Sequence, residues 1–158
     1  MNKEQAIKRI EAIEAEAKEL RAIIDAPERK PWQKWKPAYS ELYYYISNYG
    51  VVYRDYNNAD NHHQYRSYTG NTYHTKEEAE RALEILTRAS ELIGDWQPDW
   101  DDDDQYKYQL SYNHSLKEWY TRGLSWCQSQ GLWFPTHESA QTMIYEFGDD
   151  LFLIMNRV

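Results

Sequence analysis

The chain takes most of its large apolar side chains from tyrosine and tryptophan. Leu, Ile, Val and Phe contribute only 27 of the 158 residues, and the formal net charge is −8. That combination usually indicates a disordered chain. The sequence also holds 15 Tyr and 7 Trp residues, and each such ring can bury roughly 150–250 Å² while keeping a polar group. We therefore predict a folded, strand-rich body with an aromatic core.

Other general features limit the class of protein. The length fits one domain, or two very small ones plus a helix. No segment approaches the roughly 20 apolar residues of a membrane span, and no basic start precedes an apolar stretch as in a signal peptide. The lone cysteine, Cys127, excludes an internal disulfide framework and a multi-cysteine zinc site. We expect a soluble protein of a reducing cytoplasm, with no membrane partner and no cofactor.

Residues 1–26 are predicted to form a helix with a seven-residue apolar repeat. The rest of this stretch is mainly Glu, Lys, Arg and Ala, which favour helices, and Pro27 stops the helix. Such a repeat is typical of a coiled-coil seam, which would make a homodimer or a higher oligomer. An amphipathic helix lying on the protein's own core explains the pattern equally well. After Ala6, the residues that would carry dimerisation are Ile10, Ile13, Ala17, Leu20 and Ile24.

The remaining chain is predicted as two blocks of strands, each followed by a helix. Residues 27–41 form a linker rich in proline and tryptophan, and residues 95–105 form an acidic connector. Thr75 and Glu78 predict a capping box at the start of the first helix, and Gly94 predicts its end. Runs of β-forming residues between turn signals predict the strands. The expected strands are 42–46, 51–56, 65–68, 106–112 and 116–120, with 125–127 as a further candidate; the expected helices are 75–93 and 137–147, with 149–156 open between helix and strand.

The two blocks match each other at a constant offset of 61 residues. In both, a glycine and an aromatic residue precede a threonine that caps a helix. This repeat predicts two β-β-β-α units, residues 42–94 and 106–158, with antiparallel strands covered by helices, and hence an α+β protein. Ser139 stands where the first unit has Glu78, so no capping box is expected in the second. The matching positions are Gly70, Tyr73, Thr75, Glu77 and Ala79 in the first unit, and Gly131, Phe134, Thr136, Glu138 and Ala140 in the second.

Negative charge is concentrated in the C-terminal part. Residues 1–38 carry a net charge of +2, whereas residues 94–158 carry −7. Neutralising phosphates needs clustered Lys and Arg, so we expect no direct nucleic-acid partner. An acidic surface can instead attract a basic protein, and nearby tryptophans are typical interface anchors. A solvated, mobile connector is the simpler interpretation. The residues predicted to bind a partner are Trp96, Asp99, Trp100, Asp101, Asp102, Asp103 and Asp104.

Four other residues could form a nucleotide-binding pocket, because an aromatic ring can stack on a base while an arginine binds a phosphate. They are Arg66, Tyr68, Trp119 and Arg122. Aromatic core packing is the alternative interpretation.

Patterns for catalysis and for metal binding are weak. Cys127 could be a nucleophile with His114 or His137 as its base, but a lone cysteine beside a tryptophan is more typical of a core. His62 and His63 are adjacent, and on a strand they would point to opposite faces, which disfavours joint metal binding with a third histidine, His74. The aspartate run lacks the glycine and the final glutamate of a calcium-binding loop. We expect no catalytic residue and no metal site.

Three motifs occur along the chain: Trp35-Lys36-Pro37, Tyr43-Tyr44-Tyr45-Ile46, and Gly70-Asn71 followed by Thr75-Lys76-Glu77-Glu78-Ala79. Together they resemble a family of small uncharacterised accessory proteins carried by phages and prophages of low-GC Gram-positive bacteria. The resemblance covers most of the chain and brings no catalytic residue with it. It implies the gene of a mobile element and therefore the cytoplasm of a bacterial host. By analogy, small acidic proteins of this kind are often inhibitors of bacterial immune systems.

We therefore expect a non-enzymatic protein that inhibits a bacterial immune system by binding. The acidic, aromatic surface from Trp96 to Asp104 would occupy a basic site on a defence nuclease such as a CRISPR effector. A second hypothesis is a sponge that sequesters a nucleotide immune signal in a pocket around Arg66 and Arg122. A third is a phage structural or assembly protein that uses the N-terminal coiled coil.

Overall fold

The structure is a computed structural model that describes Arg9, Ile13, Ala17, residues 35–125 and residues 132–155. The chain divides into two compact units, Met1–Lys30 and Pro31–Val158. In the first unit, the three described residues are helical and exposed. The other residues predicted for the seam, Ile10, Leu20 and Ile24, lie outside the described residues. The coiled coil and the dimer therefore stay predictions.

The unit Pro31–Val158 contains an antiparallel hairpin near its start. β1 (Leu42–Ile46) pairs with β2 (Val52–Tyr56). In the turn, the backbone N–H of Ser47 donates to the Val51 carbonyl oxygen at 2.9 Å, and the Ser47 hydroxyl accepts from the Val51 N–H at 3.2 Å. Gly50 adopts a φ of +69° here, a conformation that glycine reaches without strain. Both predicted strands are confirmed to within one residue.

A helix, α2 (Asn61–Tyr68), stands where the sequence predicted a strand at 65–68. That prediction was wrong because Asp60 is an N-cap: its carboxylate accepts a hydrogen bond from the backbone N–H of His63 at 2.7 Å. The buried residues of this helix, His63 and Ser67, are four apart and share one helical face. The tyrosines that suggested a strand are exposed on α2.

A single bridge takes the place of that strand. Tyr73 pairs with Tyr44 through two backbone hydrogen bonds of 2.9 Å. Beside this bridge, the Asn71 side chain imitates a strand against Ile46. Its Oδ1 accepts from the Ile46 N–H at 2.9 Å, and its Nδ2 donates to the Ile46 carbonyl oxygen at 2.7 Å. These four bonds occupy the edge of β1 that faces away from β2.

The long helix α3 (Lys76–Ile93) confirms the helix predicted at 75–93. The Thr75 hydroxyl accepts from the Glu78 N–H at 3.1 Å, and the Glu78 carboxylate accepts from the Thr75 N–H at 3.4 Å, as expected of a capping box. The helix buries a stripe of small and branched residues at helical spacing. They are Ala79, Ala82, Ile85 and Ala89.

The second half contains a three-stranded antiparallel sheet in the order β4-β3-β5. Its strands are β3 (Lys107–Asn113), β4 (Glu118–Leu124) and β5 (Trp133–Phe134). The strand predicted at 116–120 begins at Glu118 instead, because Asn113 Oδ1 accepts from the backbone N–H groups of Ser115 and Leu116 and holds a turn there. Ser125 forms a bend, which corrects that end of the candidate strand 125–127; the other two residues lie outside the described part.

The chain then turns into α4 (His137–Phe147), as predicted, followed by η1 (Gly148–Leu151) and α5 (Phe152–Met155). The segment left open between helix and strand is therefore helical over its described residues. The absence of a capping box in α4 was a wrong prediction. The Thr136 hydroxyl accepts from the Ser139 N–H at 3.1 Å, and the Ser139 hydroxyl accepts from the Thr136 N–H at 3.3 Å. A serine hydroxyl thus satisfies the donor that a glutamate satisfies in α3.

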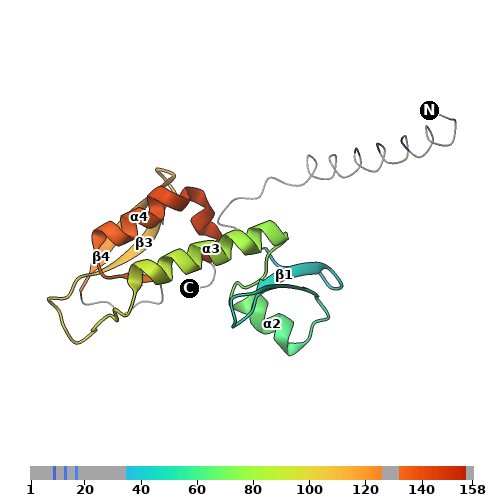
Figure 1. Cartoon of the computed structure of the whole chain (residues 1–158), viewed down its shortest axis with the longest axis horizontal. Coiled ribbons are helices and arrows are strands. Elements are labelled where there is room, and N and C mark those ends of the chain that lie inside the picture. Colours follow the sequence, from blue (N-terminus) through green and yellow to red (C-terminus); the bar gives the residue numbers. More distant parts are fainter. Residues whose placement is uncertain (1–8, 10–12, 14–16, 18–34, 126–131, 156–158) are drawn as a thin grey trace. The chain divides into compact units, whose positions relative to one another are not determined.

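One hydrophobic core joins the two halves of this unit. Helix α3 contacts β1 and β2 and also β5, α4, η1 and α5 (Figure 1). The buried cluster includes Ile46 and Tyr73 from the first half, Ile85 from α3, and Phe134 and Met143 from the second half. The described part is therefore a mixed α+β structure with two antiparallel sheets. The predicted β-β-β-α pattern does not describe the first half, where α2 interrupts it.

Candidate functional site

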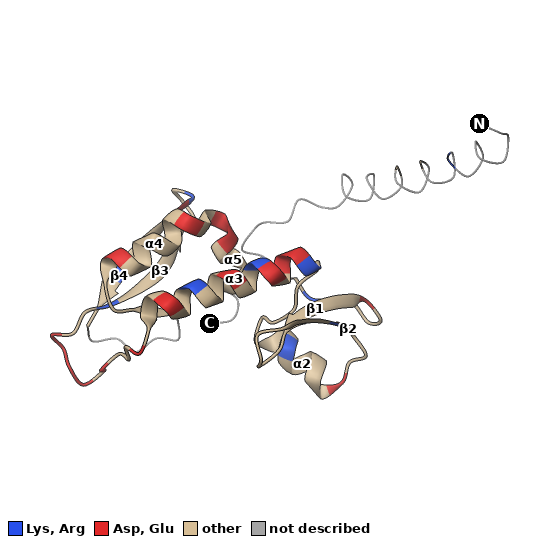
Figure 2. Ribbon diagram, in the orientation of Figure 1, with Lys and Arg blue, Asp and Glu red and all other residues tan. Residues whose placement is uncertain are grey.

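An acidic loop, residues 95–105, connects α3 to β3 and contains every residue predicted to bind a partner (Figure 2). Its five central aspartates, Asp99, Asp101, Asp102, Asp103 and Asp104, are exposed. None of these carboxylates forms an ion pair with another residue in the part of the chain that the structure describes. Among the described residues, no ion pair therefore neutralises these five carboxylates.

The aspartates also give the acidic loop a defined conformation. Asp99 Oδ1 accepts from the backbone N–H of Asp101 at 3.0 Å, and Asp102 Oδ1 accepts from that of Asp104 at 2.9 Å. Gln105 Oε1 accepts from the Asp99 N–H at 2.8 Å and links the two ends of the aspartate run. Aspartate favours such turns because its side chain reaches the backbone two residues further on. The same residues thus shape the loop and supply its charge.

A buried lysine anchors the acidic loop. Lys107, the first residue of β3, is fully buried, and its Nζ donates to the carbonyl oxygens of Asp102 at 2.9 Å and Ser125 at 3.3 Å. The ammonium also stands 5.3 Å from the centre of the Trp100 ring. A buried ammonium needs such acceptors in place of water. Lys107 therefore ties the loop to the end of β4. Sequence reasoning missed it because lysine is rarely fully buried.

The two tryptophans of the acidic loop are partly buried. The Trp100 ring meets the edge of the buried Trp133 ring of β5, with 5.1 Å between the ring centres. Trp100 is thus engaged with the protein's own sheet as well as with Lys107. The groups of the loop that remain open to a partner are mainly the aspartates.

The structure does not bring the predicted nucleotide pocket together. Arg66 lies on α2, where Nη1 donates to the Tyr43 hydroxyl at 2.8 Å and to the Asp55 carboxylate at 2.7 Å, and its guanidinium stacks 3.6 Å from the Tyr45 ring centre. Trp119 lies on β4 and packs against Tyr112 and Phe152. Of the other two predicted residues, Tyr68 is exposed on α2 and Arg122 is exposed on β4. Arg66 and Trp119 are each engaged in packing within their own half, as the alternative interpretation held.

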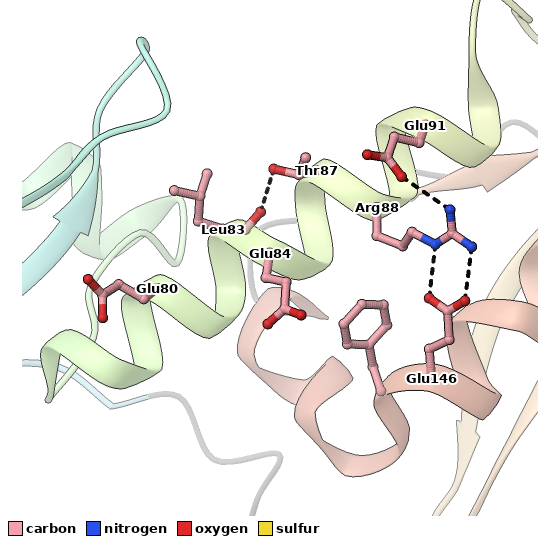
Figure 3. Close-up of a pocket in the computed structure, with 8 residues that line it drawn as sticks. Glu80, Leu83, Glu84, Thr87, Arg88, Glu91 and Glu146 are labelled. Atoms are coloured by element: carbon pink, nitrogen blue, oxygen red, sulfur yellow. Dashed lines mark hydrogen bonds and ion pairs between the residues drawn. The ribbon is translucent and has the colours of Figure 1, made fainter.

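Two arginines of α3 connect this helix to the C-terminal helices. Arg88 donates from Nε and Nη2 to both carboxylate oxygens of Glu146 in α4, at 2.9 Å each (Figure 3). Arg81 donates from Nε to Asp150 of η1 at 2.8 Å. The hydrogen bond from Arg88 lowers the pKa of Glu146 below its ordinary value. The Arg88–Glu146 pair lines a groove on the outer surface of α3 that the sequence pattern did not predict.

The other candidate residues are scattered. His62 and His74 are exposed, whereas His63 is buried, and Cys127 lies outside the described residues. Among the residues that the structure describes, no group of three or more His, Cys, Asp or Glu side chains could hold a metal ion. Within the same residues, no helix combines the length and the apolar character needed to cross a membrane.

His63 makes the stability of the fold depend on pH. Its Nε2 lies 3.1 Å from the Ser67 hydroxyl, and its Nδ1 is buried without a hydrogen-bond partner among the described residues. Burial lowers the pKa of His63 below its ordinary value of 6.5, although Asp60 opposes this shift. The unfolded chain therefore binds the proton more tightly than the folded chain. The contribution of His63 to the free energy of unfolding is therefore fully present above about pH 6.5. It is lost as the pH falls through the pKa of His63 in the folded chain.

We expect the free energy of unfolding to decrease as the pH is lowered from 7.5 to 5. His63 alone contributes a slope of at most about 1.4 kcal/mol per pH unit. Urea titrations at several pH values measure it. His63→Gln should flatten the dependence, whereas His62→Gln, a change at the exposed neighbour, should leave it intact. An unchanged slope in His63→Gln would assign the effect to other groups.

Comparisons with protein-family models, with curated proteins and with solved structures found no match to this chain.

Proposed function

We propose that this chain is a non-enzymatic phage or prophage protein that inhibits a bacterial immune system by binding a basic surface on a defence nuclease, such as a CRISPR effector. The observation that supports the proposal is the acidic loop. Its five exposed aspartates have no ion-pair partner among the described residues. The phage setting rests on the resemblance of the Trp35-Lys36-Pro37, Tyr43–Ile46 and Gly70–Ala79 motifs.

The chemistry of the target explains why an acidic loop would inhibit it. A nuclease binds the phosphate backbone with clustered Lys and Arg side chains. Carboxylates presented to that cluster would compete with phosphates for the same donors. Lys107 and the aspartate turns form hydrogen bonds that restrain the loop before binding, which would reduce the conformational entropy lost on docking. The negative charge of the exposed aspartates would also steer the encounter.

The first test is protection of an infecting phage. The chain is expressed in a bacterial strain that carries a defined nuclease-based defence, and the efficiency of plating is measured. We expect wild-type protein to restore plating and the fourfold variant Asp101→Asn, Asp102→Asn, Asp103→Asn, Asp104→Asn to lose at least about 90% of that effect. The matched control changes four exposed carboxylates elsewhere, Glu77, Glu118, Glu138 and Asp149, to their amides. Equal loss in both variants would show that net charge alone matters, not the loop.

A binding measurement tests the electrostatic mechanism directly. The affinity of the purified chain for the inhibited nuclease is measured between 50 and 500 mM salt. Exposed charges are screened within about 8–10 Å at physiological ionic strength, so we expect the affinity to fall steeply. Salt-independent affinity would rule out the acidic loop as the main contact even if inhibition were observed.

The two other hypotheses have less support. A nucleotide sponge would need Arg66, Arg122 and aromatic rings in one pocket. Arg66 lies on α2 and is bonded to Tyr43 and Asp55, whereas Arg122 lies on β4 of the second half. A structural role in the virion depends on the N-terminal coiled coil, most of which lies outside the described residues. Copurification of the chain with phage particles would favour that role over immune inhibition.

A further inference from the structure

An open groove of about 410 Å³ runs along the outer face of α3 beside α4 (Figure 3). Six of its residues come from α3 at alternating spacings of three and one, so they line one face of the helix. The other two come from the end of α4. The lining residues are Glu80, Leu83, Glu84, Thr87, Arg88, Glu91, Glu146 and Phe147.

Carboxylates outnumber the cations that neutralise them around this groove. Arg88 serves both Glu146 and Glu91, and Arg81 serves both Asp150 and Glu84. Each arginine is thus shared by two carboxylates. The side chains of Glu84 and Glu91 remain 60% exposed, and each uses one oxygen in these ion pairs. Both glutamates can therefore accept further hydrogen bonds from outside.

The floor of the groove is apolar. Leu83 is partly buried, and the buried Phe147 ring already carries one guanidinium, that of Arg81, 4.8 Å from its centre. Apolar surface beside carboxylates suits an arginine side chain, whose aliphatic stem packs while its charged end stays polar. The guanidinium also forms the two-pronged bonds to carboxylates that Arg88 makes to Glu146 within this protein.

The spacing of the two exposed glutamates defines the length of the ligand. Glu84 and Glu91 are seven residues apart, which corresponds to a rise of about 10.5 Å along an α-helix. We therefore assign one arginine of the ligand to each carboxylate. In an extended polyproline II segment, which has three residues per turn and a rise of about 3.1 Å per residue, residues three positions apart lie on the same side and are separated by about 9 Å. An Arg-x-x-Arg sequence therefore fits the two carboxylates.

We propose that this groove binds an extended, basic segment of a partner protein, with one arginine at Glu84 and a second at Glu91. The inference deepens the proposed function, since it rests on the same choice of a basic protein partner. It names a second contact surface besides the acidic loop and the side chains that would occupy it.

The probe is a capped hexapeptide, acetyl-Gly-Arg-Ala-Ala-Arg-Gly-amide, titrated into the full chain while methyl and amide NMR signals are recorded. We expect the signals of Leu83 and Thr87 to shift with the peptide. They should not shift with the peptide in which both arginines are replaced by citrulline, which has the same shape without the charge. Glu84→Gln with Glu91→Gln should weaken binding about tenfold, since it removes two charge pairs. The matched control, Glu77→Gln with Glu138→Gln, should change affinity less than twofold.

Two outcomes would overturn the groove proposal: shifts confined to the acidic loop, or equal affinity for wild type and the Glu84→Gln, Glu91→Gln variant. Circular dichroism is the check that the variants are folded. The acidic-loop variant separates the two proposals. If it loses phage protection while the groove variant binds the peptide normally, the groove is wrong and the proposed function stands. If the groove variant loses the peptide while the acidic-loop variant still protects, the groove stands and the proposed function of the loop fails.

Discussion

Replacing Lys107 by methionine is expected to lower the free energy of unfolding by about 2–4 kcal/mol. The change removes two hydrogen bonds from a charged donor, each worth roughly 1.5–3 kcal/mol, and recovers part of the cost of burying the ammonium. Methionine keeps the length of the side chain, so the loss of packing is small. The carbonyl oxygens of Asp102 and Ser125 lose their shared donor. Urea denaturation measures the change.

The same variant tests whether Lys107 shapes the acidic loop. In Lys107→Met, the backbone amides of the loop should exchange with solvent faster, even under conditions where the fold remains intact. Lys76→Met is the control, because Lys76 is exposed and makes one ion pair within α3, worth a few tenths of a kcal/mol. A stable Lys107→Met protein with an unchanged loop would show that the aspartate turns order this segment without the lysine.

Replacing Phe134 by alanine is expected to lower the free energy of unfolding by about 3–5 kcal/mol, the usual effect of deleting a fully buried aromatic ring. Phe134 is completely buried in β5, where it stands opposite Tyr108 of β3. Thermal or urea denaturation measures the loss. Val52→Ala, a change at a partly buried residue of β2 at the edge of the same core, should have a smaller effect.

The Phe134→Ala variant also reveals whether the two halves unfold together. Phe134 belongs to the same buried cluster as Ile46 and Tyr73 of the first half. We therefore expect the variant to reduce the hydrogen-exchange protection of β1 as much as that of β3, in one cooperative transition. Loss of protection in β3 alone would show that the halves are separate folding units in spite of their shared contacts with α3.

The elements best predicted from the sequence are those specified by residues close together in the chain. The hairpin at β1 and β2 follows from two runs of β-formers around a turn that ends at Gly50. The helix α3 follows from the capping box of Thr75 and Glu78 and from an apolar stripe at helical spacing. Caps, turns and periodicity act over a few residues, so a single sequence is sufficient to recognise them.

The prediction from the sequence was wrong where two local signals favoured different structures. Residues 65–68 contain two tyrosines, which favour strands, but Asp60 caps a helix that includes them. The helical spacing of His63 and Ser67 decides in favour of α2, because it places both on one buried face. In α4, Ser139 closes a capping box that was assigned only to glutamate. In both places the deciding interaction is local, because Asp60 and Ser139 each bond to the backbone three residues away.

The candidate sites also contain one part that the sequence predicts and another that only the folded chain brings together. The sequence alone located the acidic loop, since five aspartates between positions 99 and 104 are visible without any fold. The conversion of that run into an ordered surface required Lys107 and Trp133, which reach it from β3 and β5. The groove on α3 required Glu146 and Phe147 of α4 beside glutamates far earlier in the chain. No pattern within a few residues of the chain predicts these contacts between distant residues.

Charge distribution, secondary-structure class and most helix and strand boundaries were therefore determined by the sequence itself, through interactions among neighbours in the chain. Only the tertiary structure decided that a lysine would be buried under an acidic loop and that Arg66 and Trp119 would pack apart. It also decided that α3 would serve both halves as the centre of one core. The physical reason is that burial and the contacts between distant residues are set by how whole elements pack, and a side chain's own identity does not specify its partners.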